Sequence, residues 1–316
     1  MKSPAFIQLH HDDHEAIRGE LLRGLQAPQA TTSPKYLYDA LGSRLFEAIT
    51  ELPEYYPTRT EAAIFQAHAP AMAALQPAGA TLVDLGAGNC EKAALLFDAF
   101  APQRYVAVDI SVDFLRSALD CLQRQFPALE MVGVGMDFSS SLALPAAVGD
   151  GPRVLFYPGS SIGNFTPAEA LAFLSQARSA CEGGGLLIGV DLVKPADVLV
   201  PAYDDALGVT AAFNRNLLLH INRLAGTNFE LAGWRHIGLF NPELSRIEMH
   251  LEAVRPTVVR WEGGERHFAA GDRIHTENSY KWQQDRFEAL LREAGFSSTQ
   301  VWTDARGWFA VFWAQA

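Results

Sequence analysis

The sequence V-D-L-G-A-G-N-C-E-K, which runs from Val83 to Lys92, decides the fold class of this chain. It closes a short apolar run with a turn that contains Gly86 and Gly88, and a segment with helical spacing follows. Glycine allows the backbone to turn tightly and to approach a ligand closely. The third glycine of the dinucleotide fingerprint is missing here, which argues against NAD and against a pyrophosphate at this turn.

Four further apolar runs of the same character follow along the chain. Together with the first, they cover residues 81–86, 105–110, 130–137, 154–159 and 185–192. Each is nearly continuous in apolar character and is flanked by Gly, Pro or Asp, which is typical of strands buried on both faces. Because helical spacing fills the segments between them, the pattern predicts an α/β domain with a parallel sheet and right-handed crossovers.

The regions around this block have a different pattern. Residues 1–60 look helical and aromatic, and residues 197–222 look helical. Residues 231–270 alternate as three or four antiparallel strands would. Helical spacing returns over residues 280–294, and a final hairpin is expected to turn at residues 304–307.

We therefore expect two domains. The Rossmann-like domain would consist of residues 62–195 plus 281–316, and a second α+β lobe, which binds the substrate, of residues 1–61 plus 196–280. Ligands of open α/β sheets bind at the carboxyl ends of the strands, so the candidate site lies there.

Composition narrows the range of partners. Lys and Arg number 25 against 36 Asp and Glu, which gives a net charge of −11 and disfavours nucleic acid as a partner. The 3 cysteines show no C-x-x-C spacing, so neither a disulfide framework nor a zinc knuckle is expected. No apolar run reaches the roughly 18 residues of a membrane span, and no signal peptide is evident. We expect a cytoplasmic monomer without a membrane partner.

Acidic residues stand at the ends of the second and third predicted strands. Asp109 is placed to accept two ribose hydroxyls. Asp137 can accept from an adenine amino group while Phe138 covers the face of the ring. A single such acid is more often a solvated strand end, but a glycine turn and two acids at three successive strand tips resemble class I S-adenosylmethionine-dependent methyltransferases. That resemblance implies a Rossmann-like, mostly parallel sheet of seven strands.

Longer motifs resemble one family within this class, the EgtD-type L-histidine Nα-methyltransferases of ergothioneine biosynthesis. The matching stretches span nearly the whole chain and lie at residues 38–61, 85–92, 159–165, 202–216, 246–251 and 276–282. The resemblance implies methyl transfer from S-adenosylmethionine to the α-amine of L-histidine, up to trimethylation, which gives hercynine.

The same resemblance, together with the strand tips, assigns the site residues. The cofactor residues are Tyr38, Gly86, Gly88, Lys92, Asp109, Asp137 and Phe138. The substrate residues are Tyr55, Tyr56, Gly159, Asn164, Tyr203, Met249, Glu277 and Ser279. Family members hold the substrate carboxylate with the residues that match Asn164 and Tyr203. They hold the imidazole with those that match Glu277 and Ser279, whose spacing of two puts both on one face of an extended segment.

The sulfonium of the cofactor is a good leaving group, so the chemistry requires alignment and a neutral amine but no metal. Tyr38 is the residue we assign as proton acceptor. The H-H-D-D-H stretch at residues 10–14 contains residue types that can ligate metals. It lies near a chain end and the sequence offers no second group of ligands to complete a site, so no metal site is expected. Two alternatives stay open, a family methyltransferase acting on another amino acid and a non-catalytic S-adenosylmethionine-binding protein. The intact substrate residues favour the enzyme.

Overall fold

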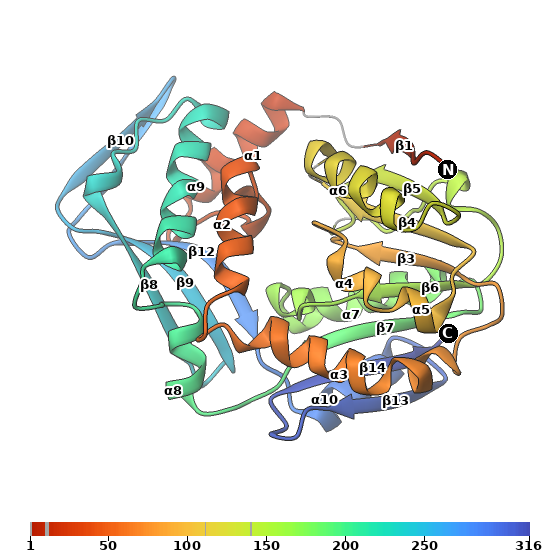
Figure 1. Ribbon diagram of the computed structural model, residues 1–316. Helices are drawn as coiled ribbons and strands as arrows, with labels where there is room; N and C mark the ends of the chain where they lie inside the picture. The colour runs from red at the N-terminus through yellow and green to blue at the C-terminus, as the bar shows by residue number, and fades with distance from the viewer. Residues whose placement is uncertain (1, 10–12, 111, 140) are drawn as a thin grey trace. The chain divides into compact units, whose positions relative to one another are not determined.

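The computed structural model describes residues 2–9, 13–110, 112–139 and 141–316. Two compact units are present (Figure 1). Unit 1 consists of Met1–His11, Pro57–Val193 and Lys281–Ala316, and unit 2 of Asp12–Tyr56 and Lys194–Tyr280. Residues 1–61 were expected to belong to the second lobe. The first strand, β1 (Ala5–Gln8), instead pairs with strand β5 (Glu130–Gly135) of unit 1.

Unit 1 contains one sheet of eight strands within the described residues, in the order β1-β5-β4-β3-β6-β7-β14-β13. Neighbours from β1 to β7 are parallel, whereas β14 is antiparallel to both β7 and β13. The mostly parallel α/β fold is confirmed, with β1 added to the seven expected strands. The other strands are β3 (Thr81–Leu85), β4 (Arg104–Asp109), β5 (Glu130–Gly135), β6 (Arg153–Tyr157), β7 (Gly185–Asp191), β13 (Ser298–Thr303) and β14 (Phe309–Gln315).

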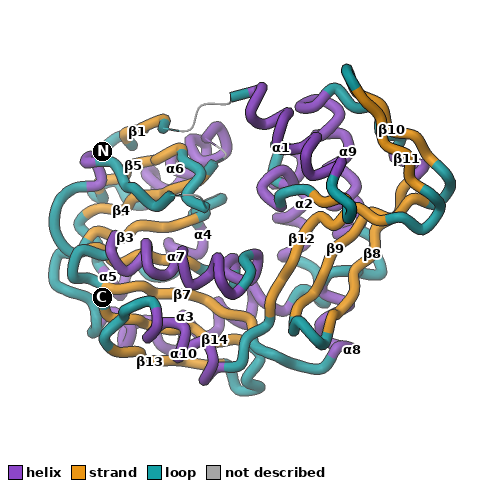
Figure 2. Tube along the Cα trace, turned by 180° about the vertical axis from the view of Figure 1, so that it is seen from behind, coloured by secondary structure: helices purple, strands orange, loops and turns teal. Residues whose placement is uncertain are grey.

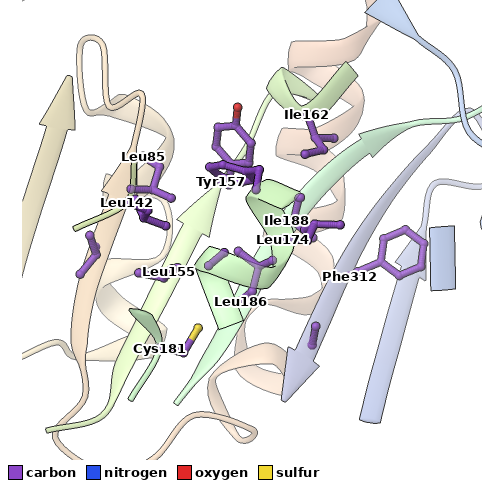
Figure 3. Packing of buried hydrophobic residues seen from close by; sticks show 14 of the residues in the cluster. Leu85, Leu142, Leu155, Tyr157, Ile162, Leu174, Cys181, Leu186, Ile188 and Phe312 are labelled. Atoms are coloured by element: carbon purple, nitrogen blue, oxygen red, sulfur yellow. The ribbon is translucent and has the colours of Figure 1, made fainter. Parts of the chain in front are cut away.

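Successive residues of a strand point to opposite sides of the sheet, and the strands of this sheet are apolar on both sides. Helices therefore cover both of its faces. Leu85, Leu155 and Ile188 pack on one face with residues of α7 and α10, and Leu82 and Val154 pack on the other with residues of α3 and α6. Figure 3 shows Leu85, Leu155 and Ile188 in the first of these clusters. Strand order reverses between β3 and β6, which is where open α/β sheets bind ligands. The helices are α3 (Tyr56–Ala73), α4 (Glu91–Ala94), α5 (Phe97–Phe100), α6 (Val112–Gln125), α7 (Pro167–Ala180) and α10 (Gln284–Glu293), with the 3-10 turns η2 (Ala146–Val148) and η3 (Ser161–Asn164).

Unit 2 contains a four-stranded sheet in the order β2-β12-β9-β8 and a separate hairpin, β10-β11 (Figure 2). The long helix α9 packs on β8 and β9 and is flanked by α1 and α2. The strands are β2 (Ala30–Thr31), β8 (Trp234–Asn241), β9 (Arg246–Ala253), β10 (Thr257–Trp261), β11 (Gly264–Phe268) and β12 (Arg273–Tyr280). The helices are α1 (His14–Gln26), η1 (Pro34–Leu37), α2 (Ala40–Thr50), α8 (Ala196–Leu199), η4 (Val200–Ala202), α9 (Val209–Ala225) and η5 (Leu231–Gly233).

The helical character expected over residues 197–222 is confirmed in α8, η4 and α9, but it is interrupted between them. Helix α8 ends at Leu199, and Pro201 lies in the 3-10 turn that follows it. The chain then leaves helical geometry until Gly208, whose φ is +76°. A proline lacks the amide hydrogen that a helix interior needs, which explains the interruption. Among the described residues, the helices are too short or too polar to cross a membrane.

Candidate active site

The turn after β3 forms an open backbone cradle. The amides of Gly86 and Ala87 both donate to the carbonyl of Val108, at 2.8 and 3.0 Å. The amide of Gly88 donates to Oδ2 of Asp109 at 2.9 Å, which ties the turn to the tip of β4. Both glycines have positive φ, +74° and +52°, and a Cβ on Gly88 would meet no heavy atom within 4 Å. The backbone is therefore exposed to a ligand at this point.

The tip of β5 lies beside the same turn. The ring of Phe138 stands edge-on to the ring of Tyr157, with centroids 5.9 Å apart. A Cβ placed on Gly86 would lie 3.6 Å from Cζ of Phe138, so this ring lies beside the glycine turn. Asp137 Oδ1 accepts from the amide and the hydroxyl of Ser139, at 3.0 and 2.5 Å. Unit 1 therefore brings the glycine turn, the first acid and the aromatic ring together, as the strand pattern predicted.

Behind the turn lies an acid that the sequence analysis did not select. Asp84 is 1% exposed, and Tyr105 donates to its Oδ2 at 2.8 Å. Its Oδ1 is buried and has no hydrogen-bond partner among the described residues. The pKa of Asp84 is raised to about 7, chiefly by burial and to a lesser degree by the nearby Asp109 carboxylate, against the lowering effect of the Tyr105 hydroxyl. An acid inside β3, just before the glycine turn, was the available signal.

A second buried acid connects three segments of unit 1. Glu61 accepts from Lys92 Nζ and from the amide of Gly159, both at 2.8 Å, and its side chain is fully buried. Gly159 has a φ of +76°. A Cβ on Gly189 would lie 1.9 Å from Glu61 Oε1, so β7 needs glycine there to make room for the carboxylate. Lys92, assigned above to the cofactor, is thus held by Glu61, the last residue of the 38–61 stretch, for which the sequence predicted no role.

The loop after β6 carries two of the predicted substrate residues. Gly159 begins it and Asn164, which is half-buried, ends the 3-10 turn η3. Ser160 holds the loop, because its Oγ accepts from the amide of Asp191 at 2.9 Å. Asp191 in turn forms an ion pair of 2.7 Å with Lys281, and both side chains are fully buried. The loop is therefore fixed to the end of β7.

Unit 2 gathers the predicted aromatic residues into one cluster. Tyr38 lies edge-on to Phe46 and Phe213, with ring centroids 5.6 and 5.5 Å apart. Phe46 also contacts Tyr55 at 6.1 Å, and Tyr55 contacts Tyr203 at 6.1 Å. Phe46 was not selected from the sequence, although its place in the quoted 38–61 stretch was a signal. Such a cluster offers several ring faces and edges to a cationic group.

Tyr203 is held at both ends. Its hydroxyl lies 2.8 Å from Ser279 Oγ, and both side chains are buried. Its backbone carbonyl lies 2.8 Å from Nε2 of His236, which must carry the hydrogen because a carbonyl only accepts. Nδ1 of His236 then accepts from Asn214 at 2.9 Å. Burial lowers the pKa of His236, which favours this neutral form.

Met249, Glu277 and Ser279 lie on the paired strands β9 and β12, and Tyr56 begins α3. Glu277 stands directly opposite Met249 on β9, and both are buried. Glu277 and Ser279 share a face, as their spacing predicted, because strand residues alternate. Tyr56 is 1% exposed and accepts from Lys194 Nζ at 2.9 Å; the ammonium also lies 4.5 Å from its ring centroid.

The opposite face of the same sheet carries Glu248, His250 and His275. These residue types can ligate metals, and one nitrogen or oxygen atom of each lies within 4.8 Å of those of the other two. Glu248 is instead bound by Arg246 at 2.7 Å and by His250 at 3.0 Å. The rings of His250 and His275 are stacked, with centroids 4.7 Å apart. In the H-H-D-D-H stretch, residues 10–12 lie outside the described part of the chain.

An open, mostly parallel sheet with a glycine turn and an acid at the next strand tip is typical of S-adenosylmethionine-dependent methyltransferases, the class to which the matching family belongs. The chain belongs, more narrowly, to the family described as histidine-specific, SAM-dependent methyltransferases, which it matches over residues 17–316.

Relatives of the chain agree with this family. It is 42% identical to the histidine N-alpha-methyltransferase of Mycolicibacterium smegmatis over 94% of each chain. It is 39% identical to the protein of the same name from Mycobacterium tuberculosis, again over 94% of each. Ergothioneine biosynthesis protein 1 of Neurospora crassa is 32% identical over 84% of this chain and 31% of its own length.

Proposed function

We propose that this chain transfers methyl groups from S-adenosylmethionine to the α-amine of L-histidine, up to trimethylation, and so produces hercynine for ergothioneine synthesis. The observation that carries the proposal is the arrangement on β12, where Glu277 and Ser279 share a face and Ser279 is bonded to Tyr203. A carboxylate and a hydroxyl can take the two nitrogens of an imidazole, one as acceptor and one as donor. Membership of the histidine-specific family supports the same substrate.

S-adenosylmethionine would be held by unit 1 and would supply the activated methyl group of its sulfonium. The open backbone at Gly86 and Gly88 fits a ligand that approaches closely. We assign the ribose hydroxyls to Asp109, the adenine amino group to Asp137 and the adenine face to Phe138. The carboxylate of Asp109, half-buried at the tip of β4, also suits a cofactor that carries positive charge. Lys92, held by Glu61, is assigned to the cofactor as well.

The residues predicted to orient the amino acid occur in both units. Tyr203 is assigned to the α-carboxylate, as a neutral donor that avoids a buried charge pair, and Asn164 remains the second predicted donor. An α-amine is mostly protonated at neutral pH, so a proton must leave before each transfer. We assign its acceptance to Tyr38, directly or through water. The aromatic cluster around Tyr38 would stabilise a methylated ammonium by roughly 0.5–2 kcal/mol for each ring.

Mass spectrometry tests this proposal. The purified protein is incubated with S-adenosylmethionine and each of the twenty standard amino acids, and with histamine. Mass increases by one to three methyl groups are expected on histidine and none on histamine, which lacks the carboxylate. Methylation of a different amino acid would replace the substrate within the family. Cofactor binding without any methylated product would favour a non-catalytic binding protein.

A further inference from the structure

Strand β12 carries one residue more than its partner at a point next to the specificity residues. His275 lies opposite His250 and Glu277 lies opposite Met249, so the pairing with β9 shifts by one residue between them. The extra residue is Thr276, and this arrangement is a β-bulge. Without it, Glu277 would stand opposite Glu248, on the other face of the sheet.

The bulge decides which face Glu277 occupies. Residues directly opposite each other in an antiparallel pair share a face, and neighbours along a strand alternate. His250 and Met249 therefore lie on opposite faces, and so do their partners His275 and Glu277. A shift of one residue moves all following side chains to the other face. The bulge thus places Glu277 and Ser279 on the face of Tyr203 and keeps them away from the ionic face around Glu248.

Two side-chain hydrogen bonds fix the bulge. Thr276 is 1% exposed, and its Oγ1 donates to the carbonyl of Met249 at 3.0 Å. Nε2 of His275 lies 3.1 Å from the carbonyl of Glu277 and donates to it. The ring of His275 is held in turn by stacking on His250, with centroids 4.7 Å apart. Each bond spans the shift, so each stabilises the bulged register over the regular one.

We propose that Thr276, assisted by His275, is a positioning residue for amino-acid specificity: its hydroxyl fixes the bulge that turns Glu277 and Ser279 toward the substrate. This inference rests on the proposed function, because it assumes that Glu277 and Ser279 read the substrate side chain. It predicts that loss of the Thr276 hydroxyl changes substrate recognition through Glu277 rather than through general stability.

The test compares Thr276→Val, which removes the hydroxyl and keeps the branched shape, with Thr276→Ser, which keeps the hydroxyl. Thr257→Val on hairpin strand β10 is the control, since it removes a similar hydroxyl bond to a backbone carbonyl. Thr276→Val is expected to lower kcat/KM about tenfold, mainly through KM, and Thr276→Ser to stay within about threefold of wild type. Affinity for S-adenosylmethionine should be unchanged in both.

The deciding measurement is a double-mutant cycle with Glu277→Ala. If the hydroxyl acts through Glu277, Thr276→Val should change kcat/KM less than about twofold in the Glu277→Ala background. An equal loss in both backgrounds overturns the inference. If Thr276→Val does not fold, His275→Phe takes its place, because it removes the bond from His275 to the carbonyl of Glu277. Its effect on kcat/KM is then compared with and without Glu277→Ala, and an equal loss in both backgrounds again overturns the inference. Wild type is assayed on histidine first, so failure of the proposed function appears separately, and the cycle then uses the amino acid that is methylated.

Discussion

The buried carboxyl of Asp84 makes stability depend on pH in a way that one substitution should remove. The ordinary pKa of this group is 3.8, and burial raises it to about 7 in the folded chain. The folded state therefore binds the proton more tightly than the unfolded state does. Its contribution to stability is fully present below pH 3.8 and is lost as pH rises toward 7.

The size of the effect follows from the two pKa values. Each pH unit within this window costs about 1.4 kcal/mol, so the whole loss is about 4 kcal/mol, an order-of-magnitude figure. Asp84→Asn keeps the shape and cannot ionise, so it does not lose this stability. We therefore compare the free energy of unfolding of Asp84→Asn with that of wild type. The difference in favour of the variant should grow by about 2 kcal/mol between about pH 5 and pH 7 and should level off above pH 7.

Urea unfolding of the cofactor-free protein at several pH values measures this difference. Tyr105→Phe is a companion variant: it removes the hydrogen bond that lowers the pKa of Asp84, so the loss of stability should extend to higher pH. Asp98→Asn, at an exposed position of α5, controls for the removal of a surface carboxylate. A difference between Asp84→Asn and wild type that does not change with pH would refute the assignment of a protonated Asp84.

Three further outcomes are expected. Asp109→Ala should weaken S-adenosylmethionine binding about tenfold to hundredfold in calorimetry, because it removes the ribose acceptor and the bond to Gly88; unchanged affinity would mean that the ribose contact lies elsewhere. Glu61→Gln should lower the free energy of unfolding by roughly 1–3 kcal/mol, a range kept low because Lys92 is partly exposed, and adding Lys92→Met should recover part of this loss. If the effects of the two substitutions simply add, the two side chains are not coupled. Tyr203→Phe should raise KM for histidine about tenfold while cofactor affinity stays as in wild type, and a KM equal to that of wild type would remove Tyr203 from the carboxylate site.

The sequence predicted the unit 1 sheet well because its strands are buried on both faces and therefore appear as continuous apolar runs. It failed for β1, a four-residue edge strand whose pairing with β5 leaves little local pattern. It indicated the helical character of residues 197–222 but not the interruption near Pro201. Spacing alone indicated that Glu277 and Ser279 share a face, but it could not indicate which face, since that depends on the bulge at Thr276.

Two buried acids of unit 1 show why part of the site was not evident from the sequence. Glu61 and Asp84 are both almost completely buried, yet only Glu61 is bound by a cation, Lys92, and by a backbone amide. Asp84 has one neutral donor, Tyr105, so burial dominates and raises its pKa. A buried carboxylate is tolerated when it is paired and hydrogen-bonded, and is otherwise driven toward its neutral form. The partner decides which case applies, and Lys92 lies 31 residues from Glu61 in the sequence. Local pattern identifies the acid, whereas its charge depends on contacts that only the folded sheet creates.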